Sequence, residues 1–303
     1  MSRHLRPKKS ALAVLSSVLL LASLAACGSS DAKEATVDKD AALYAALPQS
    51  IKDRGSLIVG ADISYAPMEF YDEDGKTPKG ADIDLAKALG KVLGVPVTFA
   101  NGTLASQITT LNAKRTDVII SAMTDTPERR QEIDFVDYLK AGTAIVVKKG
   151  NPEGIASLDD LCGKKVAALR GTTQEAMLDD QSAKCTEAGK PGIEQLNFDN
   201  DSQGLLQVRQ GRAVANLNDF AVAKYNVETA GGGDFYEVAG DLIPAVGSYG
   251  IGVRKDDAEL RDAMLKAVET IMSDGSYDAV LEKWGLEGSA LDAPVVNGGQ
   301  PGA

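Results

Sequence analysis

The sequence contains one histidine, His4, among its 303 residues. His4 lies in the first 26 residues, which we expect to be cleaved off as a signal peptide, so the mature chain would have no histidine. This absence excludes a Ser-His-Asp triad, a Cys-His nucleophile pair and any histidine-ligated zinc or iron site. We therefore expect a protein that is not an enzyme and that holds neither a metal nor a cofactor.

Basic residues are also few, because 32 Lys and Arg stand against 43 Asp and Glu, for a formal net charge of −11. Removal of residues 1–26 takes away four basic and no acidic residues, which lowers the charge to −15. A chain this acidic offers no basic surface to nucleic acid or to anionic lipid. We expect no nucleic-acid partner, and contact with the membrane through a lipid anchor only.

The N-terminus combines a basic start with an apolar run over 11–21 of mainly Ala, Val, Leu and Ser. The basic residues are Arg3, Arg6, Lys8 and Lys9. The run is too short for a membrane span and is followed by small residues, which is typical of a signal peptide. Leu24-Ala25-Ala26-Cys27 resembles a bacterial lipobox, so we predict a signal peptide over 1–26, lipidation of Cys27 on the outer face of the cell membrane, and a tether over 27–50. A plain secretory leader and a membrane helix are the alternatives.

Two further cysteines remain, Cys162 and Cys185. Disulfides form in the oxidising environment that an exported protein meets, so we expect these two to be joined. The bridge would close a loop of 22 residues, and the chain-entropy estimate for such a loop is roughly 3 kcal/mol of stability. Two free buried thiols are the alternative.

Short β-rich runs alternate with helical patterns through the middle of the chain. We expect strands at 57–59, 117–120, 145–147, 166–169 and 213–217, and helices after Asp82, over 105–114, after Ser157, near Thr173, after Ser202 and over 220–227. This alternation predicts an α/β fold with mostly parallel sheets, and the length favours two lobes. Residues 287–303 are rich in Gly and Pro, and we expect them to form a disordered tail.

Ligands of open α/β sheets lie at the carboxyl ends of strands, against helix N-termini. Arg129 follows such a strand and the Thr126-Pro127 helix start, and its guanidinium fork matches a carboxylate. Asp219 follows another strand, where its carboxylate could accept an ammonium group. A solvated arginine paired with Glu128 or Glu132, and an ordinary N-cap for the helix after Asp219, are the competing interpretations.

Two other strand ends carry polar or aromatic residues. Residues 170–175 bring Gly171 and Thr173 to a helix start, and residues 60–70 bring Asp62, Tyr65 and Phe70 to a turn. A capped turn and core packing of the aromatic rings are the simpler explanations.

In this order, the motifs resemble those of the solute-binding proteins of bacterial ABC importers, specifically the family for polar amino acids. The resemblance spans about 57–286 and includes the stretches 60–70, 80–86, 124–135, 171–175, 211–219, 250–255, 274–277 and 283–285. It implies a lobe of 51–140 plus 246–286, a second lobe of 141–245 and a ligand cleft between them. The protein would be a monomer that delivers an amino acid with a polar or basic side chain to a permease.

The resemblance also implies roles for individual residues. Arg129 would bind the α-carboxylate with help from Thr124 and Thr173, Asp219 would accept from the α-ammonium group, and Tyr65 and Asp62 would face the ligand side chain. The full candidate ligand site is Asp62, Tyr65, Phe70, Ser121, Ala122, Thr124, Arg129, Gly171, Thr173 and Asp219. The sequence departs from the family pattern at Ala122, where serine is frequent, and at Val214, where aspartate usually follows Gly-Arg.

Two other functions stay open at this point. Relatives that resemble cyclohexadienyl dehydratases act on prephenate or arogenate, and without histidine the acid would have to be Glu69, Glu175 or Asp62. A receptor that binds without transport is the third possibility. Arg130 and Asp201 lie near the candidate ligands in sequence, and we expect their removal to leave binding almost unchanged.

Overall fold

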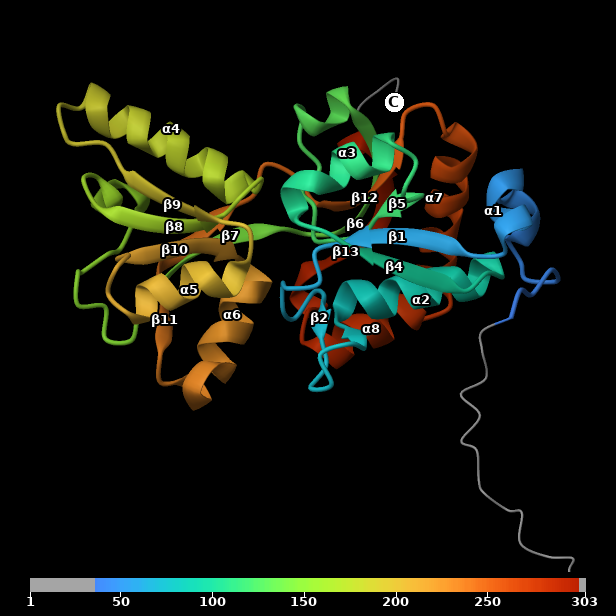
Figure 1. The fold of residues 1–303 in the computed structure, drawn as a ribbon, viewed down its shortest axis with the longest axis horizontal. Coiled ribbons are helices and arrows are strands. Elements are labelled where there is room, and N and C mark those ends of the chain that lie inside the picture. Colours follow the sequence, from blue (N-terminus) through green and yellow to red (C-terminus); the bar gives the residue numbers. More distant parts are fainter. Residues whose placement is uncertain (1–35, 300–303) are drawn as a thin grey trace, which may run out of the picture. The chain divides into compact units, whose positions relative to one another are not determined.

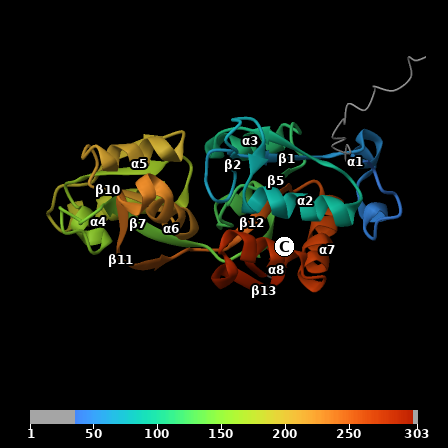
Figure 2. The ribbon, with the colours of Figure 1, turned by 90° about the horizontal axis from the view of Figure 1, so that it is seen from below.

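The computed structural model describes residues 36–299, which build two β-sheets from different parts of the chain (Figures 1 and 2). The strand orders are β13-β6-β12-β5-β1-β4 and β11-β7-β10-β8-β9. The first sheet contains β1 (Leu57–Ala61), β4 (Val97–Asn101), β5 (Val118–Ile119), β6 (Ile133–Leu139), β12 (Tyr249–Arg254) and β13 (Ala290–Val296). The second contains β7 (Gly142–Lys148), β8 (Lys165–Leu169), β9 (Glu194–Phe198), β10 (Ala215–Asp219) and β11 (Tyr236–Pro244). A small hairpin pairs β2 (Phe70–Tyr71) with β3 (Pro78–Lys79).

The chain passes between the two sheets twice. β6 ends at Leu139 and β7 begins at Gly142, and β11 ends at Pro244 before β12 begins at Tyr249. The second sheet is therefore one continuous stretch, whereas the first draws on stretches before and after it. This is the two-lobed α/β architecture that the sequence predicts.

Strand pairing is mixed, so the expectation of mostly parallel sheets holds only for part of each sheet. β4, β1 and β5 run parallel, as do β10, β8 and β9. β12, β6 and β13 join the first sheet antiparallel, and β7 and β11 join the second antiparallel. The two crossings are flanked by β6, β7, β11 and β12. The direction of these strands follows from the crossings rather than from a helical crossover unit.

Helices cover both sheets (Figure 1). The α-helices are α1 (Gln49–Arg54), α2 (Ala81–Leu93), α3 (Gln107–Asn112), α7 (Ala258–Ser273) and α8 (Ser276–Trp284) around the first sheet, and α4 (Thr173–Glu187), α5 (Asp201–Arg209) and α6 (Phe220–Thr229) around the second. The 3₁₀ turns are η1 (Tyr44–Ala46), η2 (Leu104–Ser106), η3 (Arg129–Gln131), η4 (Leu158–Leu161), η5 (Ala230–Gly233), η6 (Glu287–Ser289) and η7 (Asn297–Gly299).

The start of α2 differs from its prediction. The N-cap is Gly80 and not Asp82, and Gly80 has a φ of +136° with no room for a Cβ, which would lie 2.1 Å from the Met68 carbonyl oxygen. Asp82 lies in the first turn instead, where its buried carboxylate accepts from the Ala122 N–H at 2.6 Å. The apolar face is the predicted one, and Gly94 ends the helix as predicted. Its buried leucines are Leu85, Leu89 and Leu93.

The second sheet is covered on both faces, because successive side chains of a strand point to opposite sides. On β7, Ile145 and Val147 join the core that includes Leu178 of α4, while Ala144 and Val146 join the core beneath α5 and α6. A strand buried on both faces reads as an unbroken apolar run. That is how residues 145–147 appear in the sequence.

Two helix starts in the second lobe depend on side-chain caps. Ser157 and Asp160 form the two hydrogen bonds of a capping box at η4, which confirms the predicted start after Ser157. At α5 the prediction is wrong, because Asn200 is the N-cap and its Oδ1 accepts from the N–H of Ser202. The N-cap lies two residues before the predicted one, and an asparagine side chain supplies the capping oxygen.

Cys162 and Cys185 form the expected disulfide, with their Cα atoms 5.6 Å apart. The bond ties the residue after η4 to the last turn of α4, so it lies wholly within the lobe of the second sheet.

Both predicted flexible ends need correction. The signal peptide and Cys27 lie outside the described residues, but the expected tether over 27–50 is ordered at its end, where Leu47 is fully buried and η1 and α1 begin. The expected disordered tail over 287–303 forms η6, β13 and η7, and β13 pairs with β6 at the edge of the first sheet. The apolar residues Leu291, Val295 and Val296 lie in that strand. Within residues 36–299, no helix has both the length and the apolar character needed to cross a bilayer.

Candidate functional site

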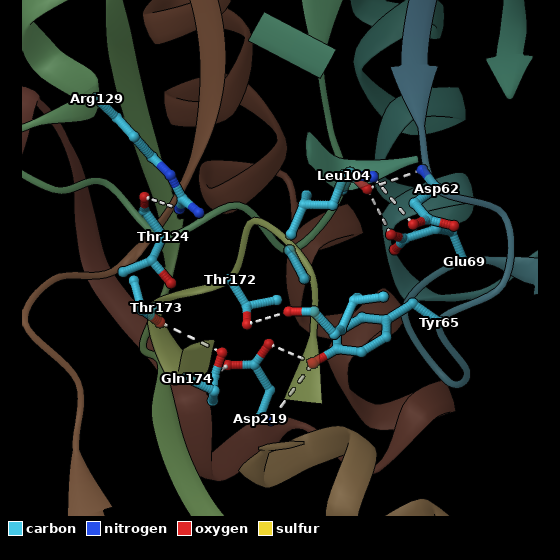
Figure 3. Close-up of a pocket in the computed structure, with 13 residues that line it drawn as sticks. Asp62, Tyr65, Glu69, Leu104, Thr124, Arg129, Thr172, Thr173, Gln174 and Asp219 are labelled. Atoms are coloured by element: carbon cyan, nitrogen blue, oxygen red, sulfur yellow. Dashed lines mark hydrogen bonds between the residues drawn. The ribbon is translucent and has the colours of Figure 1, made fainter. Parts of the chain in front are cut away.

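A pocket lies where the carboxyl ends of strands from both sheets meet (Figure 3). β1 and β5 bring residues of the first sheet, and β8 and β10 bring residues of the second. The pocket is lined by Asp62, Tyr65, Glu69, Leu104, Ser121, Ala122, Thr124, Arg129, Leu169, Thr172, Thr173, Gln174 and Asp219. Residues that the sequence places after strands of both sheets therefore lie together in one pocket.

Most of the predicted site residues line this pocket, and two do not. Phe70 packs instead against Tyr225 and Trp284, with ring centroids 6.0 and 5.9 Å away. Gly171 lies at the rim, where its carbonyl oxygen accepts from the Arg129 guanidinium at 2.8 Å. The simpler explanation of Phe70 as a packing residue is therefore the right one.

Five lining residues were not among the predicted ligands: Glu69, Leu104, Leu169, Thr172 and Gln174. Glu69 was considered only as an acid for the dehydratase alternative. Thr172 is the N-cap of α4, and Gln174 lies in the first turn of that helix, so the helix start that predicts Thr173 could have indicated both neighbours. Leu104 and Leu169 carry no polar signal, and only the fold brings them here.

Arg129 is directed into the pocket rather than along the surface. It lies at the start of η3, a 3₁₀ turn where an α-helix was expected. Its Nη1 donates to the Thr124 carbonyl at 2.6 Å and its Nη2 donates to the Gly171 carbonyl of the other lobe at 2.8 Å. Burial lowers the pKa of Arg129, and the nearby Asp219 opposes that shift. The guanidinium is thus held in place by carbonyl oxygens, without an ion pair to Glu128 or Glu132.

Asp219 ends β10 and is the N-cap residue of α6, but its side chain makes no capping hydrogen bond. Its carboxylate accepts from the Tyr65 hydroxyl at 2.7 Å and from the Gln174 Nε2 at 2.9 Å. The residue is 5% exposed, and burial raises its pKa while the Tyr65 hydrogen bond acts against the rise. The carboxylate faces the pocket, so the simple N-cap interpretation fails.

A second acidic group lies on the side of the pocket opposite Arg129 in Figure 3. Glu69 is fully buried; its Oε1 accepts from the Ser121 hydroxyl at 2.7 Å, while no N–H or hydroxyl within residues 36–299 donates to its Oε2. Asp62 accepts from the Ser64 hydroxyl at 2.6 Å and from the Leu104 N–H at 3.0 Å.

The pKa shifts at this end come from burial and from crowded carboxyl groups. Burial and then the charge of Asp82 raise the pKa of Glu69 well above its ordinary value. Burial raises the pKa of Asp82 to about 6 and also raises the pKa of Asp62. Two carboxyl groups in hydrogen-bond contact cannot both be ionised cheaply, so protonation of one member of the Glu69–Asp82 pair is favoured. Among the described residues, no cluster of three or more carboxylate, cysteine or histidine side chains could hold a metal ion.

Arg130 and Asp201 both make hydrogen bonds close to residues of the pocket. The Arg130 Nε donates to buried Asp125 at 2.5 Å, and Asp201 accepts from Asn218, the neighbour of Asp219, at 2.7 Å. Burial raises the pKa of Asp201 to about 7. Both side chains support pocket segments, so neither is suited as a neutral control for binding.

Residues 57–287 match the model of the bacterial extracellular solute-binding proteins, family 3. The chain is 33% identical over 247 residues to a histidine-binding periplasmic protein of Escherichia coli (strain K12), covering 80% of this chain and 90% of the relative. An ancestral arginine-binding protein bound to arginine is 39% identical, with a TM-score of 0.70, and is covered over 98% of its length and 76% of this chain.

A third similar structure is an ancestral amino acid-binding protein described as a precursor of cyclohexadienyl dehydratase. It is 36% identical with a TM-score of 0.69, over 78% of this chain and 98% of its own. Apart from β13, the family match covers both sheets, and it includes every residue that lines the pocket. This chain belongs to the bacterial extracellular solute-binding proteins of family 3.

Proposed function

We propose that this chain is an extracytoplasmic receptor that binds a basic amino acid and delivers it to the permease of an ABC importer. One observation carries the proposal. A half-buried cation, Arg129, and a buried acceptor, Asp219, come from different lobes and line one pocket, which has a further acidic end at Glu69 and Asp62.

The first two groups suit the part that all α-amino acids share. A guanidinium has five N–H donors, and Arg129 uses two of them on carbonyl oxygens of the described residues, which leaves donors for a carboxylate. Asp219 is held by Tyr65 and Gln174 and has lone pairs left for an ammonium group. A zwitterion satisfies both charges at once, and a buried charge without a partner is costly.

The acidic end suits a ligand side chain that donates protons. Glu69 Oε2 is buried at the pocket with no N–H or hydroxyl donor among residues 36–299, and Asp62 lies beside it on the same side. A guanidinium, ammonium or imidazolium group would supply an N–H donor in place of a proton shared with Asp82, and would add a compensating charge. Two of the similar proteins described above are named for histidine and for arginine, which supports a basic ligand.

Binding would be coupled to closure of the lobes. Arg129 and Glu69 belong to the first lobe, Asp219 to the second, so a ligand gains all its contacts only when the lobes meet. In the structure the Tyr65 hydroxyl and the Gly171 carbonyl already bridge the lobes. We propose that the closed form is the one recognised by the permease, and that the receptor is a monomer anchored through lipidated Cys27.

Titration calorimetry of the purified protein against single amino acids tests the proposal. We expect arginine, lysine or histidine to bind most tightly, neutral glutamine more weakly and glutamate not at all. Tight binding of glutamate, or binding of no amino acid in the panel, would overturn it.

The dehydratase alternative is not favoured, although Glu69 and Asp62 line the pocket and burial raises the pKa of Glu69. Glu175, the other candidate acid, is occupied outside the pocket by the Gly171 N–H at 2.6 Å and by Asn197. We expect incubation with prephenate or arogenate to leave both compounds unchanged. Their dehydration by purified protein, lost on Glu69→Gln, would restore this alternative.

A further inference from the structure

The C-terminal residues 290–299 lie beyond the family match, which ends at residue 287. We refer to them as the C-terminal strap; they comprise β13 and η7. The segment that carries Ser121, Ala122, Thr124 and Arg129 to the pocket is residues 121–130, the ligand loop. The strap lies against β6, the strand that follows the ligand loop, and reaches the loop itself.

Three contacts hold the strap in place. Val295 and Val296 pair with Asp137 and Val136 of β6. The Asn297 side chain, 5% exposed, accepts from the Phe135 N–H at 2.8 Å. A buried side-chain acceptor that replaces a strand partner fixes the register of the segment, because a shift by one residue would leave it unsatisfied.

The end of the strap packs on Arg130. A Cβ built on Gly298 would lie only 2.3 Å from the Arg130 Nη2, and Gly298 has a φ of +63°. Its backbone N–H also contacts the carboxyl group of Asp137 and opposes the rise of that pKa. The left-handed backbone favours glycine here, and a Cβ would have to displace the end of the Arg130 side chain.

Arg130, Asp125 and Asp137 form one buried cluster beneath the loop. The Arg130 Nε donates to Asp125, which is fully buried, and the Asp125 N–H donates to the Ser248 carbonyl of the returning crossing at 2.8 Å. Asp125 Oδ2 and Asp137 Oδ1 find no other partner within residues 36–299. A proton between the two carboxyl groups satisfies both oxygens.

This shared proton is retained at neutral pH. Burial, and then the neighbouring Asp125, raise the pKa of Asp137 to about 8. The charged group that faces the pair is Arg130 of η3, while the strap and β12 contribute Gly298 and Gly250, which do not titrate.

The cluster is connected to the ligand residue by short steps. Asp125 lies next to Thr124, whose carbonyl oxygen accepts from Arg129, and the Arg130 N–H donates to the Thr126 carbonyl at 2.9 Å. A shift of Asp125 or Arg130 must therefore displace the carbonyl that orients the Arg129 guanidinium.

We propose that the C-terminal strap and the cluster of Arg130, Asp125 and Asp137 position the ligand loop, and through it the Arg129 guanidinium, for binding. The strap lies outside the family match, and it supports the ligand site. Its effect on affinity rests on the proposed role of Arg129, but its effect on the loop does not.

Two readouts test this inference on the whole protein. The first is calorimetric affinity for L-arginine. We expect Arg130→Met and Gly298→Ala each to weaken binding about tenfold, as expected for coupled contacts. Arg130→Lys should recover part of the loss, and Gly288→Ala, where a Cβ meets open space, should bind as the wild type does.

The pH profile separates positioning from general damage. Asp137→Asn keeps a donor toward Asp125 but cannot titrate, so it should bind arginine at about pH 7 as the wild type does. Above about pH 8 the wild type should lose affinity relative to this variant, because the shared proton leaves. The ligand's own ammonium group titrates equally in both comparisons.

The second readout is hydrogen exchange of the amides of residues 121–131, which needs no ligand. We expect faster exchange there in Arg130→Met and Gly298→Ala, and no change in Gly288→Ala. Unchanged exchange and unchanged affinity in the first two variants would overturn the inference. If exchange rises but the wild type binds no amino acid, the proposed function fails and the positioning role stands.

Discussion

Two pairs of buried carboxyl groups contact the ligand loop at different points, and they differ in what surrounds them. Glu69 and Asp82 contact the first residues of the loop, Ser121 and Ala122, and no N–H or hydroxyl of residues 36–299 donates to Glu69 Oε2 at the pocket. Asp125, in the middle of the loop, contacts Asp137 and accepts from Arg130.

The two pairs differ in whether the protein supplies a positive charge beside the carboxyl groups. Arg130 bonds to Asp125, whereas no cation of the described residues bonds to Glu69 or Asp82. The first pair is therefore incomplete until a cationic ligand arrives, and the second is complete within the chain. A buried carboxyl pair thus indicates a ligand subsite only when its counter-charge is missing from the protein.

The pairs should also respond to pH with opposite signs. A cationic side chain next to Glu69 favours its ionised form, so binding favours release of a proton from the first pair and tightens as pH rises through the raised pKa of that pair. Loss of the proton from the second pair repels Asp125 from Asp137 and weakens binding above about pH 8.

We expect the largest loss of affinity when the Arg129 guanidinium, which both pairs flank, loses its role in the pocket. Arg129→Ala and Asp219→Ala should each weaken binding of the best amino acid by about 2–5 kcal/mol, or roughly 30- to 5,000-fold, because a buried charge loses its partner. Calorimetry checks this, with Arg209→Ala on the exposed side of α5 as the control. Unchanged affinity in Arg129→Ala would remove the basis of the pocket assignment.

The next effect distinguishes the two pairs directly. Glu69→Gln should weaken binding of arginine by about 1–3 kcal/mol while changing the affinity for glutamine much less, because it removes only the charge that matches the side chain. Proton release, measured by calorimetry in buffers of different ionisation enthalpy, should vanish. If Glu69→Gln and Asp137→Asn behaved alike, the distinction between an open and a completed pair would be wrong.

A smaller effect concerns stability against pH. The folded pKa of about 6 for Asp82 and about 8 for Asp137 both exceed the ordinary value of 3.8. Each group contributes stability that is fully present below its pKa in the unfolded state. This stability is lost as pH rises through its pKa in the folded state. We expect the melting temperature to fall from about pH 4 to about pH 8, by about 2–4 °C for each kcal/mol. Asp137→Asn should flatten the upper part of that fall, and an identical profile would contradict the assignment.

The smallest effect on binding is expected from the disulfide, which is remote from both pairs. Cys162→Ser with Cys185→Ser should lower the melting temperature, in line with roughly 3 kcal/mol of stability for a loop of this size. Affinity for arginine should stay unchanged, since both cysteines lie in the second lobe away from the pocket. A loss of affinity without a loss of stability would place the bridge in the binding mechanism.

Local patterns were enough to predict the residues that end strands and start helices. Arg129, Thr173 and Asp219 could be found because polar residues after apolar runs meet at one edge of a sheet, whatever the rest of the fold is. The disulfide and the two-lobed α/β class follow from equally local features, namely cysteine count and strand-helix alternation. The mostly parallel pairing holds only for part of each sheet, because strand direction at the two crossings is a property of the whole chain.

Only the tertiary structure decided which side chains meet across long separations. Glu69 is an ordinary acid in the sequence, and only the fold buries it against Ser121 and Asp82 with no N–H or hydroxyl donor for its Oε2 among residues 36–299. Phe70 packs against residues far along the chain, and the presumed tail becomes a strand because β6 offers it an edge. The sequence by itself determined which groups can carry charge and where the strands end. The three-dimensional packing determined which of those charges are completed by the protein and which are left for a ligand, because burial and partners belong to pairs of distant residues and not to any local pattern.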